Sequence, residues 1–460
     1  MTEDTSLGQN RIARVSVISS DSIVVQQKPV TLTASVENKL DELVTGTLIW
    51  NVQSVFFDSP PPTEQPISLN GRKSISCEYS FSMPCPGFAD IECQFLTSKS
   101  DTPITTNYRI GSDVESIVSP LTAQKDFFVF WEQSLTQLAE VLPLFQMTPR
   151  PNKARSEVRL HEVSMESFGD VTVRGWLETP NRSGVFPAVL RLPGYGQSMR
   201  PVGDQEDLVV FSFNPRGHGN SQDDVPGTPQ DYWVRGLDDR DTYFYRGAYL
   251  DCIRAIDFIC SLDNVDQERI AVWGASQGGG FAFATAALDD RVDLCVADIP
   301  FLCDWTNYFK LTQWDEMDKW LNEKQHRSWS HALKTMSYFD TMNLCERVTC
   351  PTIMSIGLQD QICPPTTSFA AFNRIRGTKT HVIYPTRGHG LGREHRQHTW
   401  RQIKELFFMT TAGKQEGIRV GVRQSFITEL GFMDTRAKTT NSSYRTTIAL
   451  DATVMTTNFS

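Results

Sequence analysis

The residues most able to do chemistry lie in Gly274-Ala-Ser276-Gln-Gly278, a G-x-S-x-G pattern at the junction of two apolar runs. Residues 270–273 predict a strand and residues 281–288 predict a helix, so the pattern falls on a strand–turn–helix. Such a turn holds its serine in a strained conformation with the hydroxyl exposed, and its two glycines let the strand and helix backbones pass closely. The alternative is a chance match in a loop rich in Gly and Ser. We predict Ser276 as the nucleophile.

A serine hydroxyl is a weak nucleophile, so it needs a general base and an acid that orients that base. Asp360 follows a short apolar run at 352–357, and His389 follows another at 381–384. Both runs predict buried strands, which places the two side chains in loops at the same sheet edge as Ser276. The order Ser, Asp, His is that of the α/β-hydrolases, and we therefore predict these three residues as a catalytic triad. The alternatives are a turn or helix-capping role for Asp360 and a surface-loop position for His389.

The tetrahedral intermediate of acyl transfer needs two N–H donors around its oxyanion. One comes from the residue after the nucleophile, here Gln277, and the other from a loop early in the hydrolase sheet. Residues 186–192 predict a strand that ends in Pro193-Gly-Tyr195-Gly196. We expect the amides of Tyr195 and Gln277 to form the oxyanion hole, with Tyr195 also contacting substrate. The alternative is a Gly-rich turn whose tyrosine only packs.

Arg216 and His218 follow the next predicted strand, at 208–213, and lie near the same sheet edge. His218 precedes the nucleophile in the chain, and this order argues against it as the base. Arg216 is expected to brace neighbouring loops through bidentate hydrogen bonds. Neither residue is predicted to be a catalytic group.

The first part of the chain, residues 1–118, has a different periodicity from the rest. Its short runs alternate between apolar and polar residues and are separated by Asn, Asp, Gly and Pro, which predicts an antiparallel β-sandwich of immunoglobulin-like type. No catalytic constellation occurs in it. We expect either a binding or spacing module, for a glycan for instance, or a lid or oligomer-interface domain.

The remainder predicts a hydrolase domain at 119–416 followed by a tail. An insertion at 301–340 is rich in aromatic residues and is expected to cover the sheet edge and shape the substrate pockets. The alternative for its tryptophans is packing within the insertion. Residues 417–460 lose strong pattern and become rich in Thr, Ser and Asn towards the end, which predicts a poorly ordered tail.

Composition narrows the partners and the compartment. The net charge is −10 and the sequence pI is near 5.4, with no run of Lys or Arg longer than two residues, so neither nucleic acid nor an anionic membrane is expected as a partner. No window approaches the ~20 apolar residues of a membrane span. The first ten residues lack the apolar core of a signal peptide. The ten cysteines form no C-x-x-C pair, so no metal site is expected, and a reducing cytoplasm fits them best.

Six motifs between residues 126 and 410 follow a known pattern: Asp126-Phe-Phe-Val-Phe-Trp-Glu132, Arg216-Gly-His-Gly-Asn-Ser221, Asn264-Val-Asp-Gln-Glu-Arg-Ile270, Gly274-Ala-Ser-Gln-Gly-Gly279, Asp298-Ile-Pro-Phe-Leu-Cys303 and Gly357-Leu-Gln-Asp-Gln-Ile-Cys-Pro-Pro365. Together they resemble carbohydrate esterase family seven, the acetyl xylan esterases and cephalosporin C deacetylases. The resemblance implies that Ser276, Asp360 and His389 are the triad. It also implies that the amides of Tyr195 and Gln277 form the oxyanion hole.

The resemblance has two departures. The family has Gln where this chain has His218, and the catalytic His of the family is followed by Glu where this chain has Gly390. Both changes are expected at the rim of the active site, where they bear on substrate range. The family often forms doughnut-shaped hexamers, which makes a homo-oligomer the expected assembly, although the sandwich lies outside the usual family pattern.

We therefore predict an α/β-hydrolase fold with a mostly parallel sheet, preceded by an antiparallel β-sandwich. The predicted activity is that of a serine esterase that removes acetyl groups from sugars or xylo-oligosaccharides, with no metal or organic cofactor. Two alternatives use the same triad, an acyl-CoA thioesterase and a peptidase, since both place a β-domain before a hydrolase domain. A third is a non-catalytic glycan-binding protein, against which the intact Ser, Asp and His count.

Overall fold

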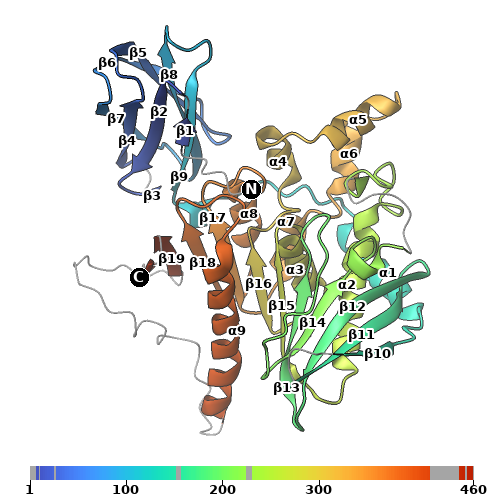
Figure 1. The fold of residues 1–460 in the computed structure, drawn as a ribbon. Coiled ribbons are helices and arrows are strands. Elements are labelled where there is room, and N and C mark those ends of the chain that lie inside the picture. Colours follow the sequence, from blue (N-terminus) through green and yellow to red (C-terminus); the bar gives the residue numbers. More distant parts are fainter. Residues whose placement is uncertain are drawn as a thin grey trace.

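The structure is a computed structural model that describes residues 7–9, 11–24, 27–151, 157–223, 231–414, 445–450 and 453–458. Its strands form three sheets. Two of them pack together as a sandwich near the N-terminus, and the third is a large mixed sheet covered by helices (Figure 1). This is the arrangement that the sequence predicted.

The N-terminal sandwich consists of a four-stranded sheet, β1-β2-β4-β7, and a five-stranded sheet, β3-β9-β8-β5-β6, antiparallel except for the pair β3 and β9. Every second residue of β4 is buried, as expected for a strand with one face on a core and the other in water. The inward residues, among them Leu32, Trp50 and Phe95, form a core of their own. The strands are β1 (Leu7–Gln9), β2 (Ala13–Ser19), β3 (Ile23–Val24), β4 (Pro29–Asn38), β5 (Val44–Gln53), β6 (Thr63–Leu69), β7 (Ser74–Ser82), β8 (Gly87–Thr97) and β9 (Ile104–Ser112).

The large sheet has the strand order β10-β11-β12-β14-β13-β15-β16-β17-β18-β19-β20. The pairings from β14 through to β19 are parallel, and the pairings at the two ends are antiparallel. The carboxyl ends of the parallel strands therefore meet at one edge, where the loops of an α/β site lie. The strands are β10 (Gln146–Arg150), β11 (Val158–Ser167), β12 (Val171–Pro180), β13 (Phe186–Leu192), β14 (Val209–Asn214), β15 (Val265–Ala275), β16 (Leu294–Asp298), β17 (Thr352–Gly357), β18 (Lys379–Tyr384), β19 (Arg445–Leu450) and β20 (Thr453–Asn458).

Helices cover both faces of the large sheet. On one face lies α9 (Gly392–Lys414) (Figure 1). Its Trp400 packs edge-on against Trp273 of β15, with ring centroids 4.9 Å apart. On the other face lie α2 (Phe244–Cys260), α3 (Gln277–Leu288) and α8 (Pro365–Phe372), with α1 (Phe127–Glu140) packed beside α2. Both faces of the central strands are therefore buried, which explains their nearly continuous apolar sequence.

The insertion between β16 and β17 forms a small helical cap. Its helices are α4 (Trp305–Leu311), α5 (Asp315–Glu323), α6 (Trp329–Met336) and α7 (Thr341–Leu344). The carboxylate of Asp340 accepts hydrogen bonds from the amides of Asp304 and Trp305, at 2.8 and 3.0 Å, so it ties the two ends of the cap together. Burial raises the pKa of Asp340 to about 7. The cap is thus closed at its base.

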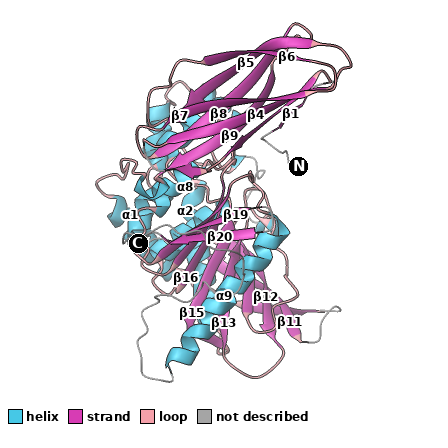
Figure 2. Cartoon of the chain, turned by 90° about the vertical axis from the view of Figure 1, so that its left-hand side faces the viewer, coloured by secondary structure: helices cyan, strands magenta, loops and turns pink. Residues whose placement is uncertain are grey.

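The sandwich lies next to strand β17 of the large sheet and next to helix α8 (Figures 1 and 2). Phe88 of β8 contacts Phe369 of α8, with ring centroids 5.9 Å apart. The side chain of Asn373, at the end of α8, donates to the carbonyl oxygens of Val114 and Ile117 at 2.8 and 3.0 Å. The sandwich and the segment that follows it are therefore both fixed to the same helix.

Two strands near the C-terminus, β19 and β20, lie within the stretch predicted as a tail. β19 pairs in parallel with β18, and β20 pairs antiparallel with β19, so both extend the large sheet. Both strands are rich in β-branched residues, which favour strands. Residues 415–444, which make up most of the predicted tail, lie outside the described residues.

Candidate active site

Ser276 lies at the sharp turn between β15 and α3. Its backbone angles, φ 59° and ψ −121°, are ones that residues with a Cβ rarely adopt, at a cost on the order of 1–3 kcal/mol. A Cβ on Gly274 would lie 2.3 Å from the backbone of Gly278, and a Cβ on Gly278 would lie 2.4 Å from the carbonyl oxygen of Leu192. Close backbone packing therefore requires both glycines, as the sequence predicted. The amide of Ser276 donates to the carbonyl oxygen of Asp298 at 2.9 Å and fixes the turn.

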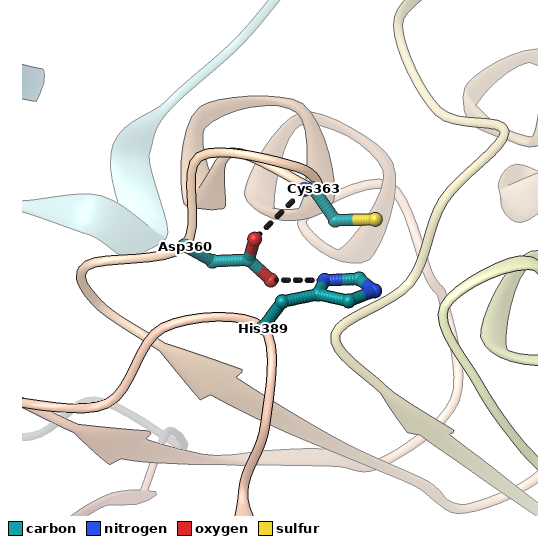
Figure 3. Close-up of side chains that lie close together, drawn as sticks. All are labelled: Asp360, Cys363 and His389. Carbon is teal, nitrogen blue, oxygen red and sulfur yellow. Dashed lines mark hydrogen bonds and ion pairs between the residues drawn. The ribbon is translucent and has the colours of Figure 1, made fainter. Parts of the chain in front are cut away.

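Asp360 and His389 meet in the loops that follow β17 and β18. His389 Nδ1 lies 2.9 Å from Asp360 Oδ2 (Figure 3). The other oxygen of the carboxylate, Oδ1, accepts from the amides of Ile362 and Cys363 at 2.8 and 2.9 Å. The fully buried carboxylate thus both forms a turn and orients the imidazole. Since a carboxylate accepts, Nδ1 is the donor and Nε2 is left as an acceptor, while the His389 side chain stays 30% exposed.

The nucleophile candidate approaches this pair through Cys363. Ser276 Oγ lies 3.8 Å from Cys363 Sγ. That sulfur lies within 4.8 Å of a ligand-type atom of both Asp360 and His389. Within the described part of the chain no hydrogen bond joins Ser276 to His389, and such bonds are often long in sites without substrate. The structure thus brings Asp360 and His389 into contact and places Ser276 beside their common neighbour.

Asp360, Cys363 and His389 are also residue types that bind zinc. Zinc takes cysteine as the thiolate, and burial raises the pKa of the Cys363 thiol well above its ordinary value, as does the nearby Asp360. Both carboxylate oxygens of Asp360 already accept hydrogen bonds from this loop and from His389. Asp360 and His389 are therefore better described as a hydrogen-bonded acid–imidazole pair, with the neutral thiol of Cys363 beside it, than as part of a zinc site.

The two predicted oxyanion donors are the amides of Gln277 and Tyr195. Gln277 is the first residue of α3, and Tyr195 lies in the turn after β13, which is closed by a 3.0 Å bond from the Gln197 amide to the Gly194 carbonyl. Among the described residues neither amide has a hydrogen-bond acceptor. The Tyr195 ring packs edge-on against Trp314, with centroids 5.7 Å apart. Tyr195 therefore both packs, as the alternative predicted, and leaves its amide open for an oxyanion.

The model of a known protein family matches more than half of this chain. The sequence model of Acetyl xylan esterase (AXE1) matches residues 114–406. The chain belongs to this family. Among curated relatives, acetyl esterase Axe7A of Xylanibacter ruminicola is 29% identical over 336 residues, which cover 70% of this chain and 74% of the relative.

Two solved structures share the fold over much of the chain. The acetyl xylan esterase of Paenibacillus sp. R4 has a TM-score of 0.59 and 30% identity, and the match covers 63% of this chain and 98% of that enzyme's chain. Acetyl xylan esterase 1 of Thermoanaerobacterium sp. JW/SL YS485 has a TM-score of 0.60 and 27% identity, and the match covers 64% of this chain and 98% of that enzyme's chain. The predicted α/β-hydrolase fold and the family resemblance are confirmed. This family member is a carboxylic ester hydrolase.

In this esterase the side chain of Gln277 is clamped from two directions. Tyr245 of α2 donates its hydroxyl to Gln277 Oε1 at 2.8 Å, and Gln277 Nε2 lies 2.9 Å from His218 Nε2. Since Gln277 Nε2 can only donate, His218 Nε2 accepts, and His218 Nδ1 then donates to the Arg216 carbonyl at 3.0 Å. Burial lowers the pKa of His218 to about 4, which keeps the ring neutral for this role.

The two departures from the family pattern differ in their surroundings. His218 is 1% exposed and lies behind Gln277, so the expectation that it lies at the rim is wrong. The apolar rings around it, including Tyr232 and Phe244, exclude water from the imidazole. Gly390 is exposed, and a Cβ at that position would meet no atom within 4 Å. A larger residue is therefore sterically permitted beside His389.

Arg216 braces the loops as predicted. Its Nε and Nη2 donate to the two oxygens of Asp251, each at 2.8 Å, in a bidentate pair. Nη2 also donates to the carbonyl oxygen of Phe168 at 2.7 Å. The pair is largely buried, so it fixes the loop that carries His218 against α2.

The aromatic residues of the cap fall into two groups. Trp305, Tyr308 and Trp320 are at least 97% buried and pack, as the alternative predicted. A second group lines a cleft of about 450 Å³ on the cap together with polar side chains, and includes Phe309, Trp314 and Trp329. Trp314 also contacts Tyr195, so the cap touches the candidate site at that ring.

Some residues near the site were not predicted. Cys363 stands in the motif after Asp360, and its spacing of three residues could have placed it in the acid loop. Tyr245 lies in α2, and its direction toward Gln277 depends on the packing of α2 on α3. The contact of the sandwich with Gln359 could not be read from any local pattern.

Proposed function

We propose that this esterase removes acetyl groups from O-acetylated sugars or xylo-oligosaccharides, with Ser276 as nucleophile, His389 as general base and Asp360 as the orienting acid. The observation that carries the proposal is the 2.9 Å contact between His389 Nδ1 and Asp360 Oδ2, beside a serine held at an elbow. With Nδ1 engaged as a donor, Nε2 offers a lone pair to the serine hydroxyl. The substrate class is supported by the names of the relatives, which are an acetyl esterase and two acetyl xylan esterases.

In the proposed reaction Ser276 Oγ attacks the acetyl carbonyl carbon while His389 Nε2 takes the hydroxyl proton. The amides of Gln277 and Tyr195 donate to the oxyanion that forms. The intermediate then collapses, the bond between the acetyl carbon and the sugar oxygen breaks, and His389 gives its proton to that oxygen. Water attacks the acetyl-enzyme by the same route, acetate leaves and Ser276 regains its proton.

Crowding around Ser276 supports a small acyl group. Cys363 lies 3.8 Å from the serine oxygen, and the Tyr195 ring is held by Tyr232 and Trp314. We expect side chains held in this way to leave little room for a longer acyl chain. Overpacking costs about 1–3 kcal/mol per misfit, which corresponds to roughly fivefold to more than a hundredfold in kcat/KM.

A series of acyl esters from acetyl to octanoyl tests this proposal. We expect kcat/KM for the acetyl ester to exceed that for the butyryl ester by at least about tenfold. A rise in kcat/KM from acetyl to octanoyl would point to the acyl-CoA thioesterase alternative, which needs a channel for a long chain.

Ser276→Ala is the control for that series. A serine-directed organophosphate should label Ser276 and abolish hydrolysis of every ester, and the variant should be neither labelled nor active. Labelling at another serine, or full activity in Ser276→Ala, would show that the nucleophile lies elsewhere.

The compartment and the assembly stay predictions. In the described part of the chain, no helix combines the length and apolar character needed to cross a bilayer. All ten cysteines are free thiols, which supports a reducing compartment such as the cytoplasm. A homo-oligomer is proposed from the family resemblance alone.

A further inference from the structure

Strand β9 of the sandwich contacts the loop that carries the proposed acid. The Arg109 amide of β9 donates to Gln359 Oε1 at 2.7 Å, and Gln359 Nε2 donates back to the Arg109 carbonyl at 3.2 Å. The side chain of Gln359 therefore pairs with the backbone of β9 much as a residue of a neighbouring strand would. Gln359 Nε2 also donates at 2.8 Å to the carbonyl of Pro385, in the loop that leads to His389. One side chain thus joins the sandwich to both catalytic loops.

The side chain of Arg109 adds a direct contact with the acid residue. Its Nη1 donates to the carbonyl oxygen of Asp360, and its Nε donates to Asp90 Oδ1 of β8 at 2.7 Å. The Arg109 side chain is 8% exposed, whereas Asp90 is 41% exposed. The guanidinium is therefore buried between the sandwich and the acid loop, with its charge partnered by Asp90. Charge-assisted hydrogen bonds in such surroundings hold their acceptors firmly.

The residue that Arg109 holds is the one whose carboxylate orients His389. A backbone shift at Asp360 would carry its carboxylate along, because the hydrogen bonds from Ile362 and Cys363 tie that carboxylate to the same loop. A misplacement of about 1 Å in a catalytic group can cost roughly 10²-fold in rate. The position of β9 is therefore coupled to the geometry of the reaction.

We propose that Arg109 is a positioning residue for the acid of the triad, so that the N-terminal sandwich supports the active site. The inference rests on the proposed role of Asp360. The ring contact between Phe88 and Phe369 and the hydrogen bonds of Asn373 do not involve Asp360. We expect them to keep the sandwich docked when Arg109 is changed, so that the change tests positioning and not attachment.

Arg109→Met removes the donors and keeps a long apolar side chain. We expect kcat for the acetyl ester to fall about 10- to 100-fold, with KM changed less than about twofold. Arg109→Lys should recover part of that loss, since an ammonium group can still donate to the Asp360 carbonyl but lacks the second, separately placed nitrogen that donates to Asp90. Arg72→Met is the matched control, because Arg72 is an exposed arginine of the same sandwich that pairs with Asp41 at 2.8 Å.

Two measurements separate positioning from folding. Titration of the active site with an organophosphate gives kcat per competent site, and thermal unfolding shows whether each variant is folded. Gln359→Met breaks the second contact between β9 and the catalytic loops, the one with the Arg109 backbone, and should also lower kcat, even if Arg109→Met folds poorly. In proton NMR the His389 Nδ1 proton should shift or broaden in Arg109→Met and stay unchanged in Arg72→Met.

Asp360→Asn, measured alongside, separates the positioning role of Arg109 from the proposed role of Asp360 in the triad. Wild-type kcat per titrated site in both Arg109→Met and Gln359→Met, beside an inactive Asp360→Asn, overturns the positioning role alone. Full activity in Asp360→Asn overturns the proposed triad and the positioning role with it.

Discussion

The two sides of the proposed site are held in different ways. On the oxyanion side, Gln277 is fixed by His218 and Tyr245, both buried within the hydrolase part of the chain. On the acid side, Asp360 is held through its backbone by Arg109, which belongs to the sandwich. The first brace lies inside the region that the family model matches, and the second comes from before residue 114, where that match begins.

This difference means that the two sides can be disturbed one at a time. A change in β9 reaches the acid loop without touching the oxyanion donors, because the braces share no residue. A change at Tyr245 or His218 reaches Gln277 without touching Asp360. The acid side is therefore the part of the site whose geometry depends on a neighbouring module.

The largest effect on activity should come from Asp360→Asn, which removes the carboxylate that accepts from its own loop and from His389. The carboxylate accepts two amides on Oδ1 and His389 on Oδ2, but asparagine offers only one oxygen. If its NH₂ group faces His389, the imidazole is forced into the wrong tautomer. We expect kcat to fall by about 10⁴-fold.

The measurement is the rate at saturating acetyl ester, with His389→Ala beside it. Triad members act as a unit, so the two variants should reach similar floors, and the double variant should lose little more. A loss of less than about tenfold in Asp360→Asn would show that another residue orients the base, since the expected loss is far larger.

A smaller effect is expected from Tyr245→Phe, on the oxyanion side. The change leaves Gln277 Oε1 buried without its donor, which costs about 1–3 kcal/mol of stability. We expect kcat to fall by roughly tenfold, which is less than the 10²–10³-fold typical when an oxyanion donor is removed, because the amide itself remains.

Combining Tyr245→Phe with Arg109→Met tests the independence of the two sides. Their effects on transition-state free energy should add to within about 0.5 kcal/mol, because the two braces share no partner. A clearly larger coupling in the double-mutant cycle would show that the oxyanion and acid sides form one network.

The smallest effect is expected from His218→Gln, and it depends on pH. Burial lowers the pKa of His218 to about 4, below its ordinary value of 6.5. Between these two pH values the unfolded chain binds a proton at this residue that the folded protein does not, so the free energy of unfolding falls as the pH falls. Glutamine does not titrate and still offers an oxygen to Gln277 Nε2. At pH 5.5 the variant should therefore gain about 1 kcal/mol relative to the wild type.

Denaturant unfolding at pH 5.5 and pH 7.5 checks this expectation. The comparison between variant and wild type cancels the titration of all other groups, including the buried Asp340. A gain of the same size at both pH values would mean that packing, and not the protonation of His218, separates the two proteins.

The order of strands and loops was largely predictable from the sequence. The runs at 186–192 and 352–357 became β13 and β17 with the predicted bounds, because apolar runs closed by Pro or Gly leave few alternatives. β9 is hard to predict from the sequence because Thr, Asn and Arg interrupt its apolar pattern. Its inward residues are recognisable only once the second sheet of the sandwich is present.

The site was predictable where chemistry depends on chain order, and not where it depends on the packing of two modules. Asp360 and His389 meet because each follows a parallel strand, and parallel strands end at one sheet edge. The contact of Arg109 with Asp360 joins residues 251 positions apart through two surfaces that have no shared periodicity. The burial of His218 likewise depends on how the rings of Tyr232 and of Phe244 in α2 pack around it.

The length of chain between β9 and the acid loop has a consequence for how the protein is made. The sandwich strands leave the ribosome first and have a core of their own, so they can fold while the rest is still being synthesised. Gln359 follows Arg109 by 250 residues. At the usual speed of translation that interval lasts roughly 10–50 s. The loops that carry Asp360 and His389 are thus made late, and they can pack against a sandwich that has already folded.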